Sequence, residues 1–266
     1  MPSKIKINSR VASTLQVGDV IAQSAYYGQS FLSVAFNPIT LFANGEQGAW
    51  YDPSDLSTLF QDDAGTTPVT EPGQTVGLML DKSGNANHAT QSTAESRPVY
   101  QAGGGLHWLE FDGVDDLFHV PVIKETPGPV SFFTGFQRFI SDRLQFIMDI
   151  EDGRFVVAAG SDSDDHSGFF GPGNWRETET DNNTPYILSA LYGTANGSLR
   201  LNGVQYSEVE GSERALAGSI KIGESGAGNH QLNGKMFSLV VIARIAEFDE
   251  VSATEQFIAQ RSGVTL

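Results

Sequence analysis

The sequence predicts an all-β protein whose strands form a two-sheet antiparallel jelly-roll sandwich, with an N-terminal arm and a short C-terminal helix. Three observations lead to this fold class. From about residue 98 onward, short apolar segments recur between turn signals. The chain has 29 glycines and 11 prolines to make those turns, and its 266 residues with 39% hydrophobic content suffice for one sizeable core.

The first 40 residues show no strong helical period. We therefore expect an N-terminal arm or accessory strands over 1–40 and the jelly-roll domain over 41–266. Lys4, Lys6 and Arg10 make the tip basic, whereas the first acidic residue is Asp19. This asymmetry suits docking on an acidic surface, although ordinary solvated charge is the favoured interpretation.

Three dipeptides mark tight turns: Asp112-Gly113, Asp152-Gly153 and Asn202-Gly203. Each tolerates the positive φ values that a two-residue hairpin needs, so each predicts a hairpin. The expected strands include five apolar segments: Val130 to Phe136, Arg154 to Ala159, Tyr186 to Tyr192, Ser219 to Ile222 and Met236 to Ile242. The last is almost entirely apolar, as expected of a central strand covered on both faces.

One helix is expected near the C-terminus. Ser252-Ala253-Thr254-Glu255 fits a capping box, which satisfies the unpaired amides of a helix start. Gly263 follows as a helix stop.

Composition limits the function classes. With 32 acidic against 16 basic side chains, the net charge of −16 opposes binding to nucleic acid. The absence of cysteine excludes disulfides and Cys-ligated zinc. No apolar stretch is long enough to predict membrane insertion or a secretory segment, so we expect synthesis in the cytoplasm.

The sequence carries no complete catalytic motif. Asp149 and Glu151 would share one face of a strand, as two carboxylates do in lectin-like glucanases with the motif Glu-x-Asp-x-x-Glu. Ile147, however, stands where the first Glu belongs, and Asp152 lies in a turn. The sequence also has no Gly-x-Ser-x-Gly elbow, Walker loop or paired-His zinc motif. We therefore expect no catalytic residues and no enzyme.

Two loops suggest binding chemistry. Asp162, Asp164 and Asp165 offer oxygen ligands suited to Ca²⁺, although a solvated hairpin loop is the favoured interpretation and no cofactor is expected. Asn174, Trp175 and Arg176 form the candidate glycan-binding group, since an aromatic face beside hydrogen-bonding groups suits a sugar ring. Packing of the Trp over a sheet edge is the competing and favoured interpretation.

Several stretches resemble the laminin G-like domains of the concanavalin A-like lectin/glucanase superfamily. These stretches are Asp81-Lys82-Ser83-Gly84-Asn85-Ala86-Asn87-His88-Ala89, Phe111-Asp112-Gly113-Val114-Asp115-Asp116, Leu201-Asn202-Gly203-Val204 and Leu232-Asn233-Gly234-Lys235-Met236-Phe237. The resemblance covers roughly residues 76 to 266. It implies a two-sheet jelly roll and carbohydrate recognition, beside the purely structural or interaction roles that are common in that superfamily.

The segment from Leu41 to Asp55, Leu-Phe-Ala-Asn-Gly-Glu-Gln-Gly-Ala-Trp-Tyr-Asp-Pro-Ser-Asp, resembles an opening found in bacteriophage structural proteins. It implies a virion protein, tail-associated or decorating the capsid, whose lectin-like sandwich contacts other virion proteins or a host surface glycan. Virion components assemble symmetrically, so we expect a homo-oligomer. A carbohydrate-binding adhesion module and a glycan-cleaving enzyme remain the alternatives.

Overall fold

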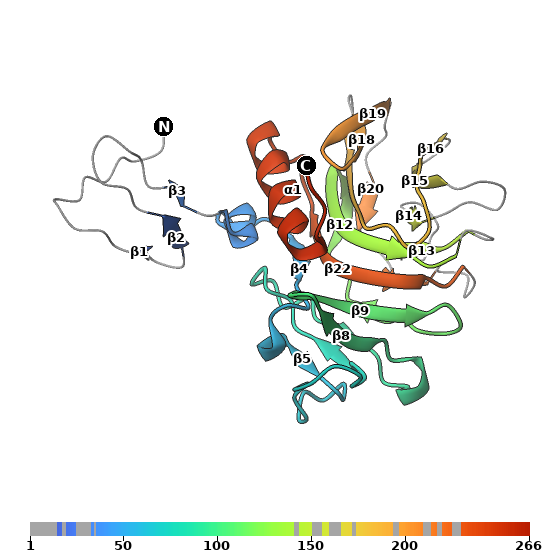
Figure 1. The fold of residues 1–266 in the computed structure, drawn as a ribbon. Helices are drawn as coiled ribbons and strands as arrows, with labels where there is room; N and C mark the ends of the chain where they lie inside the picture. Colours follow the sequence, from blue (N-terminus) through green and yellow to red (C-terminus); the bar gives the residue numbers. More distant parts are fainter. Residues whose placement is uncertain are drawn as a thin grey trace.

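The computed structural model describes residues 15–17, 20–24, 33–34, 36–140, 144–150, 156–159, 166–171, 174–193, 197–209, 214–216, 220–224 and 230–266. Two large antiparallel sheets that pack face to face form the main body of the fold, followed by one C-terminal α-helix (Figure 1). The predicted two-sheet sandwich with a short C-terminal helix is thereby confirmed. The expected division between an arm over 1–40 and a domain over 41–266 stays a prediction.

The eight-stranded sheet runs in the order β19-β18-β17-β12-β22-β9-β8, with β4 also paired to β22. Its strands are β4 (Gly48–Tyr51), β8 (Val99–Gly103), β9 (Leu106–Asp112), β12 (Val130–Arg138), β17 (Tyr186–Tyr192), β18 (Gly197–Leu201), β19 (Val204–Val209) and β22 (Asn233–Ile242). As predicted, β22 is a central strand, lying between β12 and β9.

The nine-stranded sheet runs in the order β16-β15-β14-β13-β21-β10-β7-β6-β5. Its strands are β5 (Leu59–Phe60), β6 (Leu78–Met79), β7 (Ala89–Thr90), β10 (Phe118–Val120), β13 (Phe146–Ile150), β14 (Val156–Ala159), β15 (His166–Gly171), β16 (Asn174–Glu179) and β21 (Ile220–Ile222). Two smaller sheets pair β11 (Lys124–Gly128) with β20 (Arg214–Leu216), and β1 (Leu15–Val17), β2 (Val20–Ser24) and β3 (Ser33–Val34) with one another.

The main core lies between the two large sheets. Alternate residues of the facing strands point into it, for example Phe111 on β9, Phe118 on β10 and Phe132 on β12, all fully buried. The rings of Phe111 and Phe118 meet edge to face, with centroids 6.4 Å apart. The chain joins the sheets repeatedly, since β9 of one sheet leads directly into β10 of the other.

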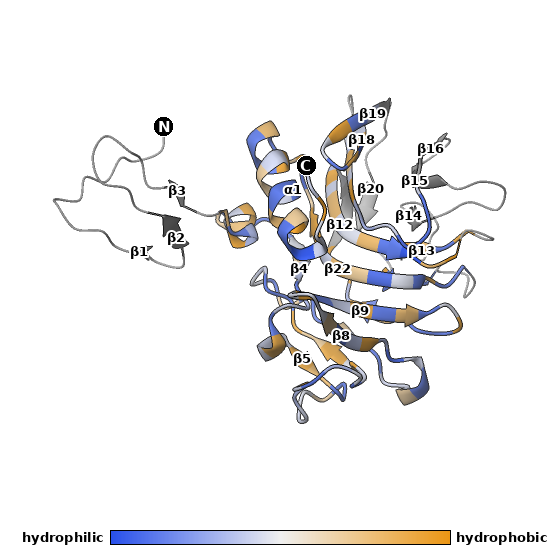
Figure 2. Cartoon of the chain, viewed as in Figure 1, coloured by the Kyte–Doolittle hydropathy of each residue, from blue (hydrophilic) through white to orange (hydrophobic). Residues whose placement is uncertain are grey.

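A second core lies on the outer face of the eight-stranded sheet, beneath helix α1 (Phe248–Ser262). Phe133 of β12, Val240 of β22 and Ile258 of α1 are fully buried there. Gly135 permits the close approach, because a Cβ at that position would lie 2.8 Å from the Ile258 side chain. The helix carries both hydrophobic and hydrophilic residues along its length, as expected for a helix with one buried face (Figure 2).

The helix begins earlier than the capping-box prediction at Ser252. Its N-cap is Glu247, whose side chain accepts from the backbone of Glu250 while the Glu250 carboxylate accepts from the Glu247 amide at 2.8 Å. Glu255 does not cap the helix, because its carboxylate binds Arg200 of β18 at 2.7 Å. The predicted stop is confirmed, since Gly263 takes a left-handed φ of 73°.

The three predicted hairpins have different outcomes. Asn202 and Gly203, with φ of 48° and 79°, join β18 to its partner β19 as expected. Asp112-Gly113 is not a hairpin: β9 pairs with β8 and β22, and the turn carries the chain into the other sheet. Asp152-Gly153 lies outside the described residues.

Three short 3-10 helices complete the sandwich: η1 (Pro38–Phe42), η2 (Leu56–Thr58) and η3 (Ala94–Ser96). Leu41 and Phe42 of η1 join the second core. Within the described part of the chain, no helix is both long and apolar enough to cross a membrane.

Candidate functional site

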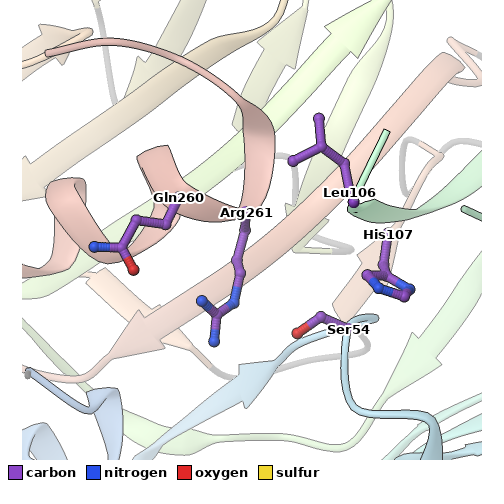
Figure 3. A pocket seen from close by; sticks show the side chains of 6 residues that line it. Ser54, Leu106, His107, Gln260 and Arg261 are labelled. Carbon is purple, nitrogen blue, oxygen red and sulfur yellow. The ribbon is translucent and has the colours of Figure 1, made fainter. Parts of the chain in front are cut away.

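A pocket of about 210 Å³ opens where three distant segments meet (Figure 3). It is lined by Ser54 after β4, by Gly105, Leu106 and His107 of the β8–β9 hairpin, and by Gln260 and Arg261 in the last turn of α1. Figure 3 shows the Arg261 side chain projecting from the helix toward Ser54, with His107 on the far side of that serine. We refer to it below as the Arg261 pocket.

Arg261 is held on two sides. Its Nε lies 3.5 Å from Oδ2 of Asp52, a carboxylate that is only 2% exposed, and its guanidinium carbon lies 4.2 Å from the centre of the Phe257 ring. The other Asp52 oxygen, Oδ1, accepts from the Ser54 amide at 3.0 Å and from the Ser54 hydroxyl at 2.6 Å. Asp52 therefore holds Ser54 through two hydrogen bonds and attracts Arg261 through its charge.

His107 is oriented by Tyr100, whose hydroxyl lies 2.6 Å from Nδ1 of the imidazole. Burial raises the pKa of Tyr100, so the hydroxyl keeps its proton. This contact uses Nδ1 and leaves Nε2 as the other polar atom of the ring.

The backbone beside the pocket is a two-glycine turn. Gly104 and Gly105 have φ of 62° and 83° and join β8 to β9, and a Cβ at Gly105 would meet nothing within 4 Å. Leu106 adds an apolar contact beside these polar groups. The pocket thus combines hydrogen-bonding groups with one aliphatic surface, a mixture typical of small-ligand sites.

A second polar group lies on the outer face of the nine-stranded sheet. Lys221 of β21 is flanked in register by Asp149 of β13 and His119 of β10. Its Nζ lies 3.0 Å from Oε2 of Glu224, and Oε1 of Glu224 accepts from the Gln231 amide at 3.2 Å. Asp149 and Glu224 are only 2% and 7% exposed. One buried carboxylate thus pairs with the ammonium group, and a second stands opposite Lys221 on the neighbouring strand.

A third group consists of Asp112, Asp115 and Asp116, in the turn between the sheets. Their carboxylate oxygens lie within 4.8 Å of one another, which could hold a metal ion. Burial raises the pKa of Asp116 to about 6, with the charges of Asp112 and Asp115 adding to the shift. Two of these carboxylates also stabilise the local fold. Asp116 accepts a hydrogen bond from the Asp112 amide, and Asp115 accepts one from the Ser96 hydroxyl, both at 2.9 Å.

The oxygen-rich stretch Asp81 to Ala89 is structural. Oδ1 of Asp81 accepts from the Trp50 and Ser83 amides at 2.9 and 2.8 Å, and Oδ2 accepts from the Ser83 hydroxyl and the Asn87 amide at 2.7 and 3.0 Å. The side chain of Asn87 donates to the Gly48 carbonyl at 2.8 Å. This stretch therefore ties β4 to the neighbouring turn.

The sequence-predicted glycan group falls on β16, at the edge of the nine-stranded sheet, where Trp175 is paired in register with Phe170 of β15. The side chains of Asn174, Trp175 and Arg176 lie outside the described part of the structure, so their glycan role stays a prediction. Asp162, Asp164 and Asp165 also lie outside the described residues, as do Glu151 and Asp152. Calcium binding at that loop is likewise still a prediction.

Sequence reasoning missed the Arg261 pocket. Its residues come from segments around positions 54, 106 and 260, and none of these segments carries a recognisable motif. The one available signal was the Gly103-Gly104-Gly105 run, which predicts a bare turn.

No family model matches the sequence, and no curated protein sequence matches it. Several solved structures share the fold. A GH54 α-L-arabinofuranosidase soaked with a cyclic sulfate inhibitor has a TM-score of 0.64 at 12% identity, and the match covers 85% of this chain and 66% of that one. An arabinofuranosidase complexed with arabinofuranosyl-α-1,2-xylobiose has a TM-score of 0.60 at 13% identity, covering 85% and 65%.

The Trypanosoma rangeli sialidase in complex with 2,3-difluoro-KDN has a TM-score of 0.52 at 9% identity, covering 88% of this chain and 34% of that one. The chain thus spans about two thirds of the arabinofuranosidases and about one third of the sialidase. These similarities correct the expectation that the chain is not an enzyme, because all three structures with this fold are enzymes. At such low identity the likeness extends to the fold alone: a β-sandwich of the kind found in glycosidases.

Proposed function

We propose that this chain is a glycan-binding β-sandwich that holds a sugar ring in the Arg261 pocket. The observation that carries the proposal is the convergence of Arg261, His107, Gln260 and Ser54 around a cavity of about 210 Å³. That volume lies below the ~300–1,000 Å³ of drug-sized ligand sites, which favours a single ring over an extended chain.

The lining fits the two faces of a sugar ring. The guanidinium, the imidazole and the Gln260 amide replace water around ring hydroxyls, while Leu106 contacts ring C–H groups. Asp52 and Tyr100 fix the first two groups before the ligand arrives, so little side-chain entropy is lost on binding.

A glycan array, followed by calorimetry on the best ligands, tests the proposal. His107→Ala and Gln260→Ala should each weaken binding roughly tenfold, because each removes about one hydrogen bond of 0.5–1.5 kcal/mol together with packing contacts. His119→Ala is the matched control, since His119 is exposed on the other sheet. Binding that is unchanged in both pocket variants would remove the proposed site.

Glycan cleavage is the second candidate function, and the Asp149–Lys221–Glu224 group favours it. Glycoside hydrolysis commonly uses two carboxyl groups, one protonated and one ionised. The ammonium of Lys221 lies 3.0 Å from Glu224, so the two groups form an ion pair. Asp149, one strand away on the same face, would be the partner that exchanges the proton.

Release of new reducing ends from polysaccharide measures this activity. Asp149→Asn and Glu224→Gln should each abolish it, whereas Asp249→Asn, in the first turn of α1, should leave it intact. If wild-type protein releases no reducing ends from host envelope or capsule polysaccharides, hydrolysis is rejected and glycan binding is unaffected.

The biological setting we propose is a bacteriophage particle, either tail-associated or on the capsid surface. The support is the resemblance of the segment from Leu41 to Asp55, which includes β4 and contributes Leu41, Phe42 and Trp50 to the core beneath α1. Made in the host cytoplasm, the chain would assemble as a homo-oligomer with other virion proteins and display the Arg261 pocket toward a host surface glycan. Mass spectrometry of purified particles should detect it, and its consistent absence would reject this placement.

A further inference from the structure

We infer that the Arg261 pocket selects a sugar residue that carries a carboxylate group, such as a hexuronate. This inference rests on the proposed glycan-binding function and narrows it to one class of ligand. Some hydrogen-bonding groups of the pocket are already bonded within the protein, and others remain for a ligand. The inference follows from the chemistry of those that remain.

The guanidinium of Arg261 presents an unused edge. Asp52 lies beside Nε at 3.5 Å and Phe257 lies beneath the plane at 4.2 Å. Nε itself is buried without a hydrogen-bond partner, and no hydrogen bond from Nη1 or Nη2 is found among the described residues. The N–H groups of Nη1 and Nη2 lie in one plane. They can donate in parallel to the two oxygens of a carboxylate and so bind it in bidentate fashion.

The neighbouring groups add few fixed acceptors. Nδ1 of His107 shares a hydrogen bond with the Tyr100 hydroxyl, so Nε2 is the ring nitrogen left for a ligand. The Ser54 hydroxyl donates to Asp52, which leaves only lone pairs for a ligand hydroxyl. Asp52 itself is 2% exposed and turned toward Ser54 and Arg261. Donors thus outnumber acceptors, and a ligand rich in acceptors fits best.

The net charge of −16 does not oppose this selectivity at close range. At physiological ionic strength the Debye length is about 8 Å, so distant surface carboxylates are largely screened. Asp52 is the acidic residue in contact with Arg261, and it occupies the Nε side. A ligand carboxylate would take the opposite edge, which keeps the two anions apart.

The test uses the full chain and three matched sets of oligosaccharides: hexuronate oligomers, the corresponding neutral hexose oligomers, and sulfated hexose oligomers. Calorimetry should give at least a tenfold preference for hexuronates over neutral oligomers. Arg261→Gln should abolish the preference, and Arg261→Lys should lose most of it, because an ammonium retains the charge but not the bidentate geometry. Circular dichroism melts of both variants verify that each is folded at the assay temperature.

Lys235→Gln is the charge control. Lys235 lies on β22 over the ring of Trp108, at 4.3 Å, and does not line the pocket. Its loss should leave the preference intact, whereas an equal loss in Lys235→Gln and Arg261→Gln would indicate general electrostatic attraction and overturn the inference.

The remaining outcomes distinguish failure of the carboxylate selectivity from failure of the proposed glycan-binding function. Equal affinity for neutral and carboxylated oligomers overturns the carboxylate selectivity while glycan binding stands. Tighter binding of sulfated oligomers overturns the choice of carboxylate. Failure to bind any oligosaccharide contradicts both the inference and the proposed function.

Discussion

The outer faces of the two large sheets have opposite character. On the eight-stranded sheet, α1 covers a second hydrophobic core that includes Phe133, Val240 and Ile258, all fully buried. On the nine-stranded sheet, the described residues of the central strands present Asp149, Lys221 and His119 outward instead. One face therefore serves mainly stability, while the other carries groups that can do chemistry. The Arg261 pocket lies at the margin of the covered face, where the last turn of α1 meets the β8–β9 hairpin.

The largest effect should come from Phe133→Ala, which empties part of the core beneath α1. Phe133 is 0% exposed, so we expect a loss of about 3–5 kcal/mol in the free energy of unfolding. Phe248→Ala removes the same side chain from a position that is 76% exposed and should cost less than about 0.5 kcal/mol. Urea denaturation measures both. Similar losses would mean that α1 does not cover a stabilising core.

Glu255→Gln tests the ion pair at the edge of the covered face. Glu255 binds Arg200 through both carboxylate oxygens, at 2.7 and 3.0 Å, and the two side chains are 2% and 14% exposed. Removing one partner of a fully buried pair costs about 3–5 kcal/mol, and partial solvent access to Arg200 reduces the expected loss to about 2 kcal/mol. Urea denaturation at low and high salt measures it; a loss under about 0.5 kcal/mol would contradict the prediction.

Asp116→Asn tests the turn that connects the two sheets, and its effect should depend on pH. The pKa of Asp116 is raised to about 6 by burial and by Asp112 and Asp115. An unfolded Asp titrates near 3.9, so the folded state binds the extra proton between about pH 4 and 6. Wild-type stability therefore falls as pH rises through that window and stays lower above it.

The Asp116→Asn variant, which has no such charge to bury, should be more stable than wild type by about 1–2 kcal/mol at pH 7.5 and about equal at pH 4. Paired urea denaturation curves at the two pH values provide the measurement. A difference that does not change with pH would show that the carboxylate charge is not responsible.

The smallest effect should come from Asp55→Asn, which breaks a partly exposed pair beside Trp50, a residue of the core beneath α1. Asp55 binds Lys82 at 2.5 Å, but the two side chains are 36% and 20% exposed. Exposed pairs contribute about 0–1 kcal/mol, and asparagine can still accept from the Ser57 amide. Thermal melts should place this variant within about 1 kcal/mol of wild type; a larger loss would make this pair as important as Arg200–Glu255.

The sequence predicted the strands well because their signal is local. Tyr186 to Tyr192 forms β17 with the expected bounds, and the apolar run from Met236 lies within the central strand β22. The errors arose where a local motif has more than one use. Asp112-Gly113 has the composition of a hairpin turn, but pairing of β9 and β10 with other strands makes it a crossing between sheets.

Local pattern thus determined the all-β class, the turn at Asn202-Gly203 and the helix stop at Gly263, because φ preferences and strand alternation act over a few residues. Tertiary structure decided that Glu255 binds Arg200 instead of capping a helix, and that Lys221 pairs with Glu224 beside Asp149. It also decided the Arg261 pocket, whose lining comes from three segments that are remote along the chain. Side chains so far apart in sequence converge only after the sheets have packed, so no local pattern can encode the site.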